Sequence, residues 1–276
     1  MISFWLLVAV SIIAGFIGAM SGMGGGIVLI PVLTFLNVDI KHAIAISLVS
    51  VIATSSGAAS AYVREHITNL KIGMFLEIFT ILGALTGASI TLVSSRRILV
   101  ILFGVVLLAS WAALFIRRQD EYRSPTKQDR LSRWLEFHGS YYDQAIGREI
   151  EYVGIRAYIG GPCMFVAGLI AGLLGIGAGA LKVLVHDLGM GLPPKVSTTT
   201  SNLIIGVTAL AGTSVYLANG LIDPALVAPV MIGIVVGALA GTRLLVRLSN
   251  QAVRKFFLTV LFALGVEMLI RGILGR

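Results

Sequence analysis

The chain has little charge and almost no cysteine, and both shortages limit what it can be. Asp, Glu, Lys and Arg supply 12% of its 276 residues, hydrophobic residues supply 57%, and the mean hydropathy is +0.95. A soluble domain of this length carries far more charge, so the composition indicates an integral membrane protein. The single cysteine, Cys163, excludes an internal disulfide and argues against a cysteine metal cluster. We interpret it as a small apolar residue of a helix.

Signals of catalysis and of nucleic-acid binding are also missing. The four histidines show no metal-ligand spacing, and the chain has no nucleophile motif, P-loop or nucleotide-binding glycine pattern. We therefore expect no enzyme, no ATP-driven pump, no metal and no cofactor. The net charge of +8 comes from basic residues scattered between apolar runs, so we expect the lipid bilayer as a partner and no nucleic acid. Residues 1–5 carry no positive side chain, which predicts a retained first span rather than a cleaved signal peptide.

Glycine, by contrast, is abundant, and a cluster of glycines occurs twice with the same spacing. Residues 22–26 (GMGGG) and 175–179 (GIGAG) interrupt apolar sequence and begin 153 residues apart. After a one-residue gap the match continues at an offset of 154, for example at Gly83 and Gly237. The chain is therefore an internal duplication. Because every backbone polar group in hydrocarbon needs a partner, two matched helix interruptions predict a transporter's substrate site between the copies.

Each copy contains five apolar segments. They cover about residues 4–21, 27–36, 41–63, 73–93 and 97–116, and then about 157–174, 180–189, 195–218, 225–246 and 252–272. A membrane crossing needs about 20 helical residues, so four segments of each copy can span, whereas the second, of roughly ten, is predicted to be a half-helix. The predicted fold class is all-α, a polytopic membrane protein of two homologous repeats. The repeats cover residues 1–118 and 156–276, and a polar linker covers residues 119–155.

The distribution of Lys and Arg predicts how the copies are oriented. An odd number of crossings in each copy places most basic residues, including those of the linker, on one side. This favours inverted repeats with a cytoplasmic linker and both termini outside; leaving out the linker reverses the preference, so parallel repeats remain the alternative. Within the linker, Ser124-Pro125 predicts the start of a short amphipathic helix, and residues 141–153 predict a hairpin that turns around Gly147.

The glycine clusters are the first candidates for binding. Glycine lets the backbone open, and a half-helix that starts beyond such a break directs free N–H groups and its positive dipole end towards an anion. The candidate residues are Gly22, Gly24, Gly25, Gly26, Gly175, Gly177 and Gly179. The alternative is close helix packing, which we expect to explain Gly83, Gly87, Gly237 and Gly241.

A buried charge is the next candidate. Lys182 lies three residues beyond the second glycine cluster in an apolar half-helix, where a lysine is costly unless it is paired or hydrated. We expect it to bind the anion; the alternatives are a pair with Asp187 or a side chain that reaches the membrane boundary. Glu77 could carry a coupling proton, or it could occupy a boundary position facing Lys71.

Hydroxyl and amide groups complete the candidate set, since they can donate to oxyanion oxygens without adding charge. They are Ser47 in the first copy and Thr200, Ser201 and Asn202 in the second. Capping of the helix that follows Pro193-Pro194, or hydrogen bonds to carbonyls one turn back, are the plain alternatives, and we assign Ser197 to them.

The doubled motif resembles a known family. Two stretches of the chain are similar to the twin signatures of the sulfite exporter TauE/SafE family. The first is residues 15–26 followed by Pro31, and the second is residues 167–179 followed by residues 199–201. The resemblance implies a secondary transporter of the prokaryotic cytoplasmic membrane that moves sulfite, sulfoacetate or another organosulfonate, usually outward. Ala178 and Ile46-Ser47 depart from the commoner family pattern, which makes the two half-sites less alike.

These signals favour an anion transporter that works by alternating access. One alternative is a cation or metal transporter, which would need carboxylates or histidines at matched places in both copies. The other is a non-transporting membrane scaffold whose linker recruits partners.

Overall fold

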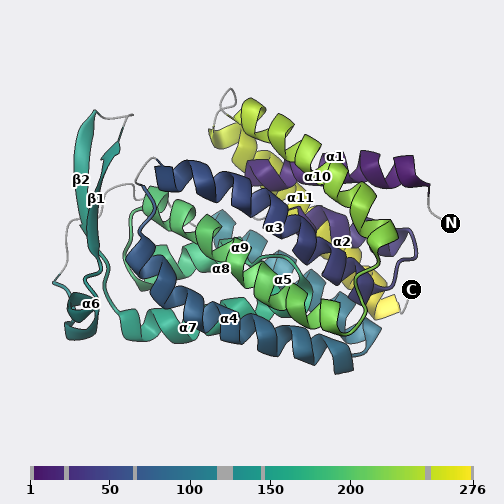
Figure 1. The fold of residues 1–276 in the computed structure, drawn as a ribbon, viewed down its shortest axis with the longest axis horizontal. Coiled ribbons are helices and arrows are strands. Elements are labelled where there is room, and N and C mark those ends of the chain that lie inside the picture. The colour runs from purple at the N-terminus through teal and green to yellow at the C-terminus, as the bar shows by residue number, and fades with distance from the viewer. Residues whose placement is uncertain are drawn as a thin grey trace.

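The computed structural model describes residues 3–21, 25–64, 67–116, 127–143, 147–245 and 250–274, and it is mostly helical (Figure 1). In the first copy the helices are α1 (Phe4–Ser21), α2 (Gly26–Phe35), α3 (Ile40–Arg64), α4 (Leu70–Val93) and α5 (Arg96–Ile116). In the second copy they are α7 (Ala157–Leu174), α8 (Gly179–Leu184), α9 (Pro194–Ala218), α10 (Pro224–Leu245) and α11 (Asn250–Leu274). A π-helical turn, η1 (Val185–Gly189), continues α8. The predicted apolar segments are confirmed to within a few residues.

The linker forms a short helix and a β-hairpin at one end of the bundle, opposite the C-terminus (Figure 1). The hairpin prediction is confirmed: β1 (His138–Asp143) pairs antiparallel with β2 (Arg148–Val153), and Gly147 has the positive φ of 64° that the turn requires. The all-α prediction is therefore wrong for the linker, because alternating side chains on both sides of this turn favour strands over a helix.

The predicted linker helix is shorter than expected. The helix α6 (Arg130–Trp134) has five residues, and Asp129 is its N-cap, accepting hydrogen bonds from the backbone N of Ser132 at 3.1 Å and from its Oγ at 2.7 Å. Ser124 and Pro125 lie outside the described residues. Trp134 is 77% exposed, so the protein itself does not cover the apolar face of this helix. Burial opposes ionisation of Asp129, but hydrogen bonds from Ser132 and from the Arg156 backbone outweigh it and lower the pKa.

Each copy packs its first helix against the fourth helix of the other copy. A Cβ atom at Gly83 of α4 would lie 2.1 Å from the carbonyl oxygen of Phe165 of α7, and one at Gly237 of α10 would lie 2.0 Å from that of Ile12 of α1. The two glycines are 154 residues apart and their partners 153 apart, so the contacts are equivalent. The packing interpretation is confirmed at Gly83, Gly87 and Gly237, where only a hydrogen fits.

Equivalent helices run in opposite directions where they meet. Gly206 of α9 lies against Ser55 of α3, whereas Gly212, later in α9, lies against Leu48, earlier in α3. The same opposite order holds between α5 and α11, at the pairs Ile101 with Gly272 and Gly104 with Leu269. Both pairs of equivalent helices are therefore antiparallel.

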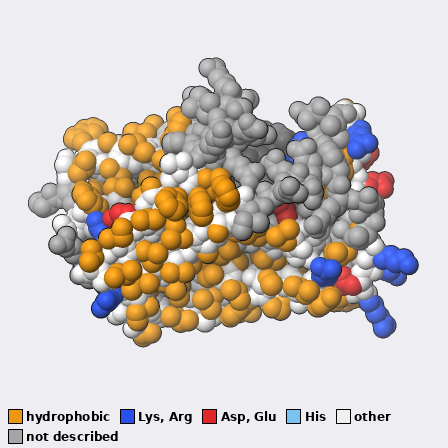
Figure 2. All heavy atoms as spheres, turned by 180° about the vertical axis from the view of Figure 1, so that it is seen from behind, with side chains coloured by type: hydrophobic (Ala, Val, Ile, Leu, Met, Phe, Trp, Pro, Cys, Tyr) orange, Lys and Arg blue, Asp and Glu red, His pale blue; other side chains and the backbone are white. Residues whose placement is uncertain are grey.

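The outer surface suits a lipid environment. Among the described residues, five helical spans are long and apolar enough to cross a membrane: Leu70–Val93, Arg96–Ala113, Ala157–Leu174, Pro194–Ala218 and Pro224–Gly241. Figure 2 shows hydrophobic side chains over the broad middle of one face and charged side chains gathered towards its ends. The half-helix α2 instead lies inside the bundle, with eight of its ten residues buried. A short helix that is apolar all round is stable there, because protein covers every side.

Candidate functional site

The helices are interrupted at both glycine clusters, as predicted. α7 ends at Leu174, and Gly175, Gly177 and Ala178 then take positive φ values of 70°, 66° and 50° before α8 begins at Gly179. In the first copy α2 begins at Gly26, and Gly25 lies in a turn before it. Gly22 and Gly24 lie outside the described residues.

The two interruptions meet in the buried core. Ser47 of α3 donates a hydrogen bond from Oγ to the carbonyl oxygen of Gly175, at 2.6 Å. A Cβ atom at Gly26 would lie 2.1 Å from Ser47 Oγ and 2.6 Å from that same carbonyl oxygen. One at Gly175 would lie 2.8 Å from the carbonyl oxygen of Ile44. Glycine is therefore required at both positions, and the structure brings together Gly26, Ser47 and Gly175 from the candidate set.

The candidate residues of α9 are buried but point to different partners. Ser201, which is equivalent to Ser47 at the offset of 154, donates from Oγ to the Gly179 carbonyl oxygen at 3.5 Å. Thr200 accepts a hydrogen bond at Oγ1 from the backbone N of Asn69, at 3.2 Å, so this hydroxyl is tied to the start of α4. Asn202 is 6% exposed. Ser201 is thus the α9 candidate in direct contact with a glycine break.

Lys182 is fully buried and belongs to a polar chain that joins three helices. Its Nζ donates to Thr208 Oγ1 of α9 at 2.8 Å, and Thr208 Oγ1 lies 3.2 Å from Glu77 Oε1 of α4. Thr80 Oγ1 also lies 3.3 Å from Glu77 Oε1. The alternative that the Lys182 side chain reaches the membrane boundary is wrong, because no part of this residue is exposed.

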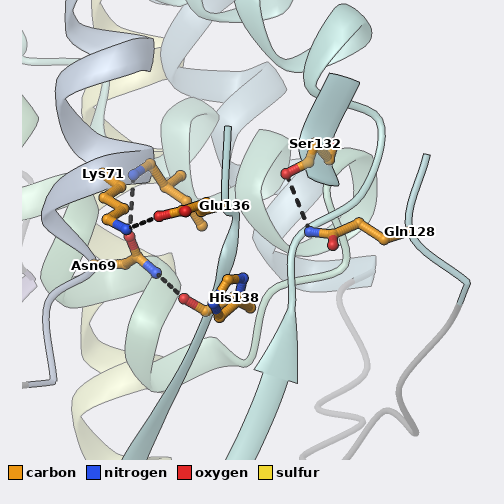
Figure 3. Close-up of polar contacts among 7 residues, drawn as sticks. Asn69, Lys71, Gln128, Ser132, Glu136 and His138 are labelled. Carbon is orange, nitrogen blue, oxygen red and sulfur yellow. Dashed lines mark hydrogen bonds and ion pairs between the residues drawn. The ribbon is translucent and has the colours of Figure 1, made fainter. Parts of the chain in front are cut away.

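Glu77 does not face Lys71, contrary to the boundary alternative. Lys71 instead forms an ion pair with Glu136 of the linker, as Figure 3 shows. One turn and a half further along α4, Glu77 points inward to Thr208, which places its carboxylate on the same hydroxyl as Lys182. A carboxylate and an ammonium group that share one buried hydroxyl compensate each other's charge.

Two further residues belong to this region, Thr208, which sequence reasoning missed, and His186, which it gave only as a weak signal. The offset of 154 pairs Thr208 with Thr54, so the duplication itself carried a signal for the first. His186 lies four residues after Lys182, in the π-helical turn η1, and is 0% exposed. Its Nδ1 lies 3.1 Å from the Ser197 carbonyl oxygen. Because a carbonyl only accepts, Nδ1 carries a proton.

The other ring nitrogen, Nε2, is buried and has no hydrogen-bond partner among the described residues. Buried polar atoms are rarely left unpaired, and π-helical turns often occur at functional sites. His186 Nε2 is thus available to a ligand beside Lys182.

One residue connects the linker to this region. Asn69 caps α4 by accepting at Oδ1 from the backbone N of Ile72 at 3.0 Å. Its Nδ2 donates to the His138 carbonyl oxygen at 3.3 Å, as Figure 3 shows, and to Tyr152 Oη at 3.0 Å. Burial raises the pKa of Tyr152, although the hydrogen bond from Asn69 opposes the shift. With its backbone bond to Thr200, Asn69 joins the hairpin, α4 and α9.

Comparison with known proteins finds relatives over most of the chain. The family model described as "Sulfite exporter TauE/SafE" matches residues 7–268. The probable membrane transporter protein YunE of Bacillus subtilis is 25% identical over 279 residues, which is 98% of this chain and 99% of that protein. YdhB of the same organism, also a probable membrane transporter protein, is 28% identical over 84% of each chain.

A third relative comes from an archaeon. The probable membrane transporter protein MJ0441 of Methanocaldococcus jannaschii is 23% identical over 96% of this chain and 95% of its own length. No solved structure matches the chain. The family model covers nearly the whole chain, including both glycine breaks, so this multi-pass membrane protein belongs to the sulfite exporter TauE/SafE family.

Proposed function

We propose that the protein is a secondary transporter that exports a small sulfur-containing anion, such as sulfite, sulfoacetate or another organosulfonate, across the prokaryotic cytoplasmic membrane. The observation that carries this proposal is the meeting of two broken helices in the core, with a fully buried lysine one turn beyond the second break. Helix ends freed by such breaks are typical of transporter binding sites. The family and the names of the relatives support transport.

The repeats are proposed to be inverted, with the linker of residues 119–155 in the cytoplasm and both termini outside. Two observations support this arrangement. Contacts between the copies occur in exchanged pairs, at Gly83 with Phe165 and at Gly237 with Ile12. Equivalent helices are antiparallel, as the order of contacts in α3 and α9 requires, whereas parallel repeats would keep equivalent helices parallel. An inverted pair can alternate access by rocking one copy against the other around a central site.

In this proposal the anion binds to Lys182 and to N–H groups at the ends of α2 and α8. The glycine clusters let the backbone approach the ligand, and Ser47, Ser201 and Asn202 supply further donors. Thr200 accepts at Oγ1 from the Asn69 backbone, and this bond does not use the hydroxyl proton, which can be donated to the anion. With Nδ1 donating to the Ser197 carbonyl oxygen, His186 Nε2 is an acceptor, so it pairs with a proton of the ligand and not with a bare oxyanion oxygen.

Proton coupling through Glu77 follows from charge balance in this region. Lys182 and Glu77 share Thr208, so an anion that binds to Lys182 leaves the carboxylate without its compensating charge. An uncompensated charge is expensive in a membrane interior, and uptake of one proton by Glu77 would remove it. We therefore propose that one proton accompanies one anion.

Sulfite flux into liposomes tests the function. Lys182→Met keeps the length of the side chain and removes its charge, and we expect a loss of at least tenfold, about 1.4 kcal/mol of binding free energy. Lys127→Met, at an exposed linker position, is the matched control and should retain the parent rate. Flux through Lys182→Met at the parent rate would remove this lysine from the mechanism. No flux of any sulfur anion through the unaltered protein would refute the transport proposal.

A further inference from the structure

The end of the bundle opposite the hairpin contains a cavity that the central site does not use. We propose that this cavity is a second binding site for an oxyanion, held by the guanidinium groups of Arg96 and Arg271. The cavity has a volume of about 550 Å³ and lies between the two copies. Its lining residues are Thr34, Phe35, Asn37 and Arg96 from the first copy and Ala263, Val266, Glu267, Ile270, Arg271 and Leu274 from the second.

Arg271 is held in a fixed orientation with part of its guanidinium group unused. Its Nε lies 3.0 Å from Glu267 Oε1, one turn earlier on α11, and its Cζ lies 5.4 Å from the centre of the Phe35 ring of α2. These contacts engage one edge and one face of the group. The two Nη atoms have no hydrogen-bond partner among the described residues, so they remain free to donate to a ligand in the cavity.

Arg96 supplies a second positive charge without a compensating partner. It is exposed at the first residue of α5, and none of the described residues pairs with it. The next residue, Arg97, differs: its Nε and Nη2 donate to the carbonyl oxygens of Gly272 and Ile273, both at 3.2 Å, at the C-terminal end of α11. Arg97 thus serves the helix end, whereas Arg96 lines the cavity.

The charged side chains that line the cavity favour an anionic ligand. Two arginines face one carboxylate among the lining residues, and that carboxylate, Glu267, is already engaged with Arg271. The cavity therefore carries an excess positive charge beside an apolar wall of α11. Planar guanidinium groups with free Nη atoms fit sulfite, sulfonate or phosphate oxygens in the bidentate manner.

The cavity and the central site lie at opposite ends of the same helix, α2. Thr34 and Phe35 are at the end of α2, and Gly26, which lies against Gly175, is at its beginning. A helix of this length spans about 15 Å, so one ligand cannot occupy both sites. If the linker is cytoplasmic, the cavity opens outward, where an exported anion leaves; this role as a release site rests on the proposed function.

Sulfite binding to the purified full-length protein, measured by calorimetry, tests the second site. In the Lys182→Met background, which removes the central charge, we expect residual sulfite binding that Arg96→Gln and Arg271→Gln each weaken about tenfold, or about 1.4 kcal/mol. Arg130→Gln, at an exposed position of the linker, is the control, since it removes the same charge at the end of the bundle opposite the cavity. The Arg96 side chain has no hydrogen bond or ion pair within the described structure to lose, so Arg96→Gln remains informative even if Arg271→Gln fails to fold.

Two further titrations identify the source of the oxyanion and separate this proposal from the transport proposal. Inorganic phosphate replaces sulfite in one, and nanodiscs of phosphatidylglycerol are compared with phosphatidylcholine in the other. Arginine-dependent stabilisation by phosphatidylglycerol or phosphate, without sulfite binding or flux, would keep the oxyanion site and refute only sulfur-anion transport. Equal binding of sulfite, phosphate and phosphatidylglycerol by the parent protein and by the double Arg96→Gln, Arg271→Gln variant would overturn the second site.

Discussion

Replacing Thr208 by valine tests whether one hydroxyl holds the buried charges in place. Valine has nearly the same shape as threonine but leaves the Lys182 Nζ without the acceptor that now lies 2.8 Å away. It also removes the hydroxyl that lies 3.2 Å from Glu77 Oε1. A buried donor without a partner costs about 1–3 kcal/mol, and more when it is charged, so we expect a loss of about 3 kcal/mol.

The assay is thermal unfolding of the purified protein, followed by tryptophan fluorescence. For a chain of this size we expect Tm to fall by roughly 6–12 °C. Thr208→Ser is the matched control, because it keeps the hydroxyl and loses one methyl group, worth about 0.8 kcal/mol. The loss on Thr208→Val should shrink when Lys182 is already methionine, since no buried charge then lacks a partner.

Two outcomes would refute this reasoning. One is a Thr208→Val variant as stable as Thr208→Ser. The other is strict additivity, within about 0.5 kcal/mol, of Thr208→Val and Lys182→Met. Either result would mean that Lys182 is compensated by something other than the Thr208 hydroxyl.

Two further predictions concern helix packing and the linker. Gly83→Ala and Gly237→Ala each place a Cβ atom against a carbonyl oxygen, at 2.1 and 2.0 Å, so both should destabilise by about 1–3 kcal/mol and by similar amounts in thermal unfolding. A harmless substitution at either site would contradict the exchanged packing. Hydrogen bonds lower the pKa of Asp129 from 3.8, so its contribution to stability is full above that pH and is lost as the pH falls through the lower folded value. Pepsin should therefore cleave the parent linker increasingly below pH 3.8, whereas Asp129→Ala should be cleaved at every pH tested; identical profiles would exclude this role.

The apolar runs predicted the helices, because a long run of hydrophobic residues favours a helix, and five of these helices are long and apolar enough to cross a membrane among the described residues. The glycine breaks were predictable for a related reason: a cluster of glycines in the middle of an apolar run favours interruption over a continuous helix. The linker helix was misplaced because a local cap, Asp129 with Ser132, decides its start, and this signal is weaker than the Ser-Pro pair upstream. The hairpin was predictable from side-chain alternation on both sides of Gly147.

The partners of the buried charges could not be predicted in the same way. Lys182 and Thr208 are 26 residues apart, and Glu77 and Thr208 are 131 apart, so their contact depends on how α4, α8 and α9 pack. The direction of Glu77 is likewise set by which face of α4 meets α9. Hydrophobicity does not mark that face, because α4 is apolar on all sides; the mark is a stripe of small and hydroxyl residues, such as Gly73, Thr80 and Ala84.

The first helix of each copy packs against the fourth helix of the other copy, and this arrangement bears on how a half-length chain would behave. A polypeptide holding only α1 to α5 would leave two glycine-lined seams facing lipid, because α1 and α4 each find their counterpart in the other half. Such a half-length chain would satisfy both seams by associating with an identical molecule in the opposite orientation. In the proposed inverted arrangement, the chain thus has the geometry of an antiparallel homodimer, so a separately expressed half should associate with a second copy of itself or with the other half.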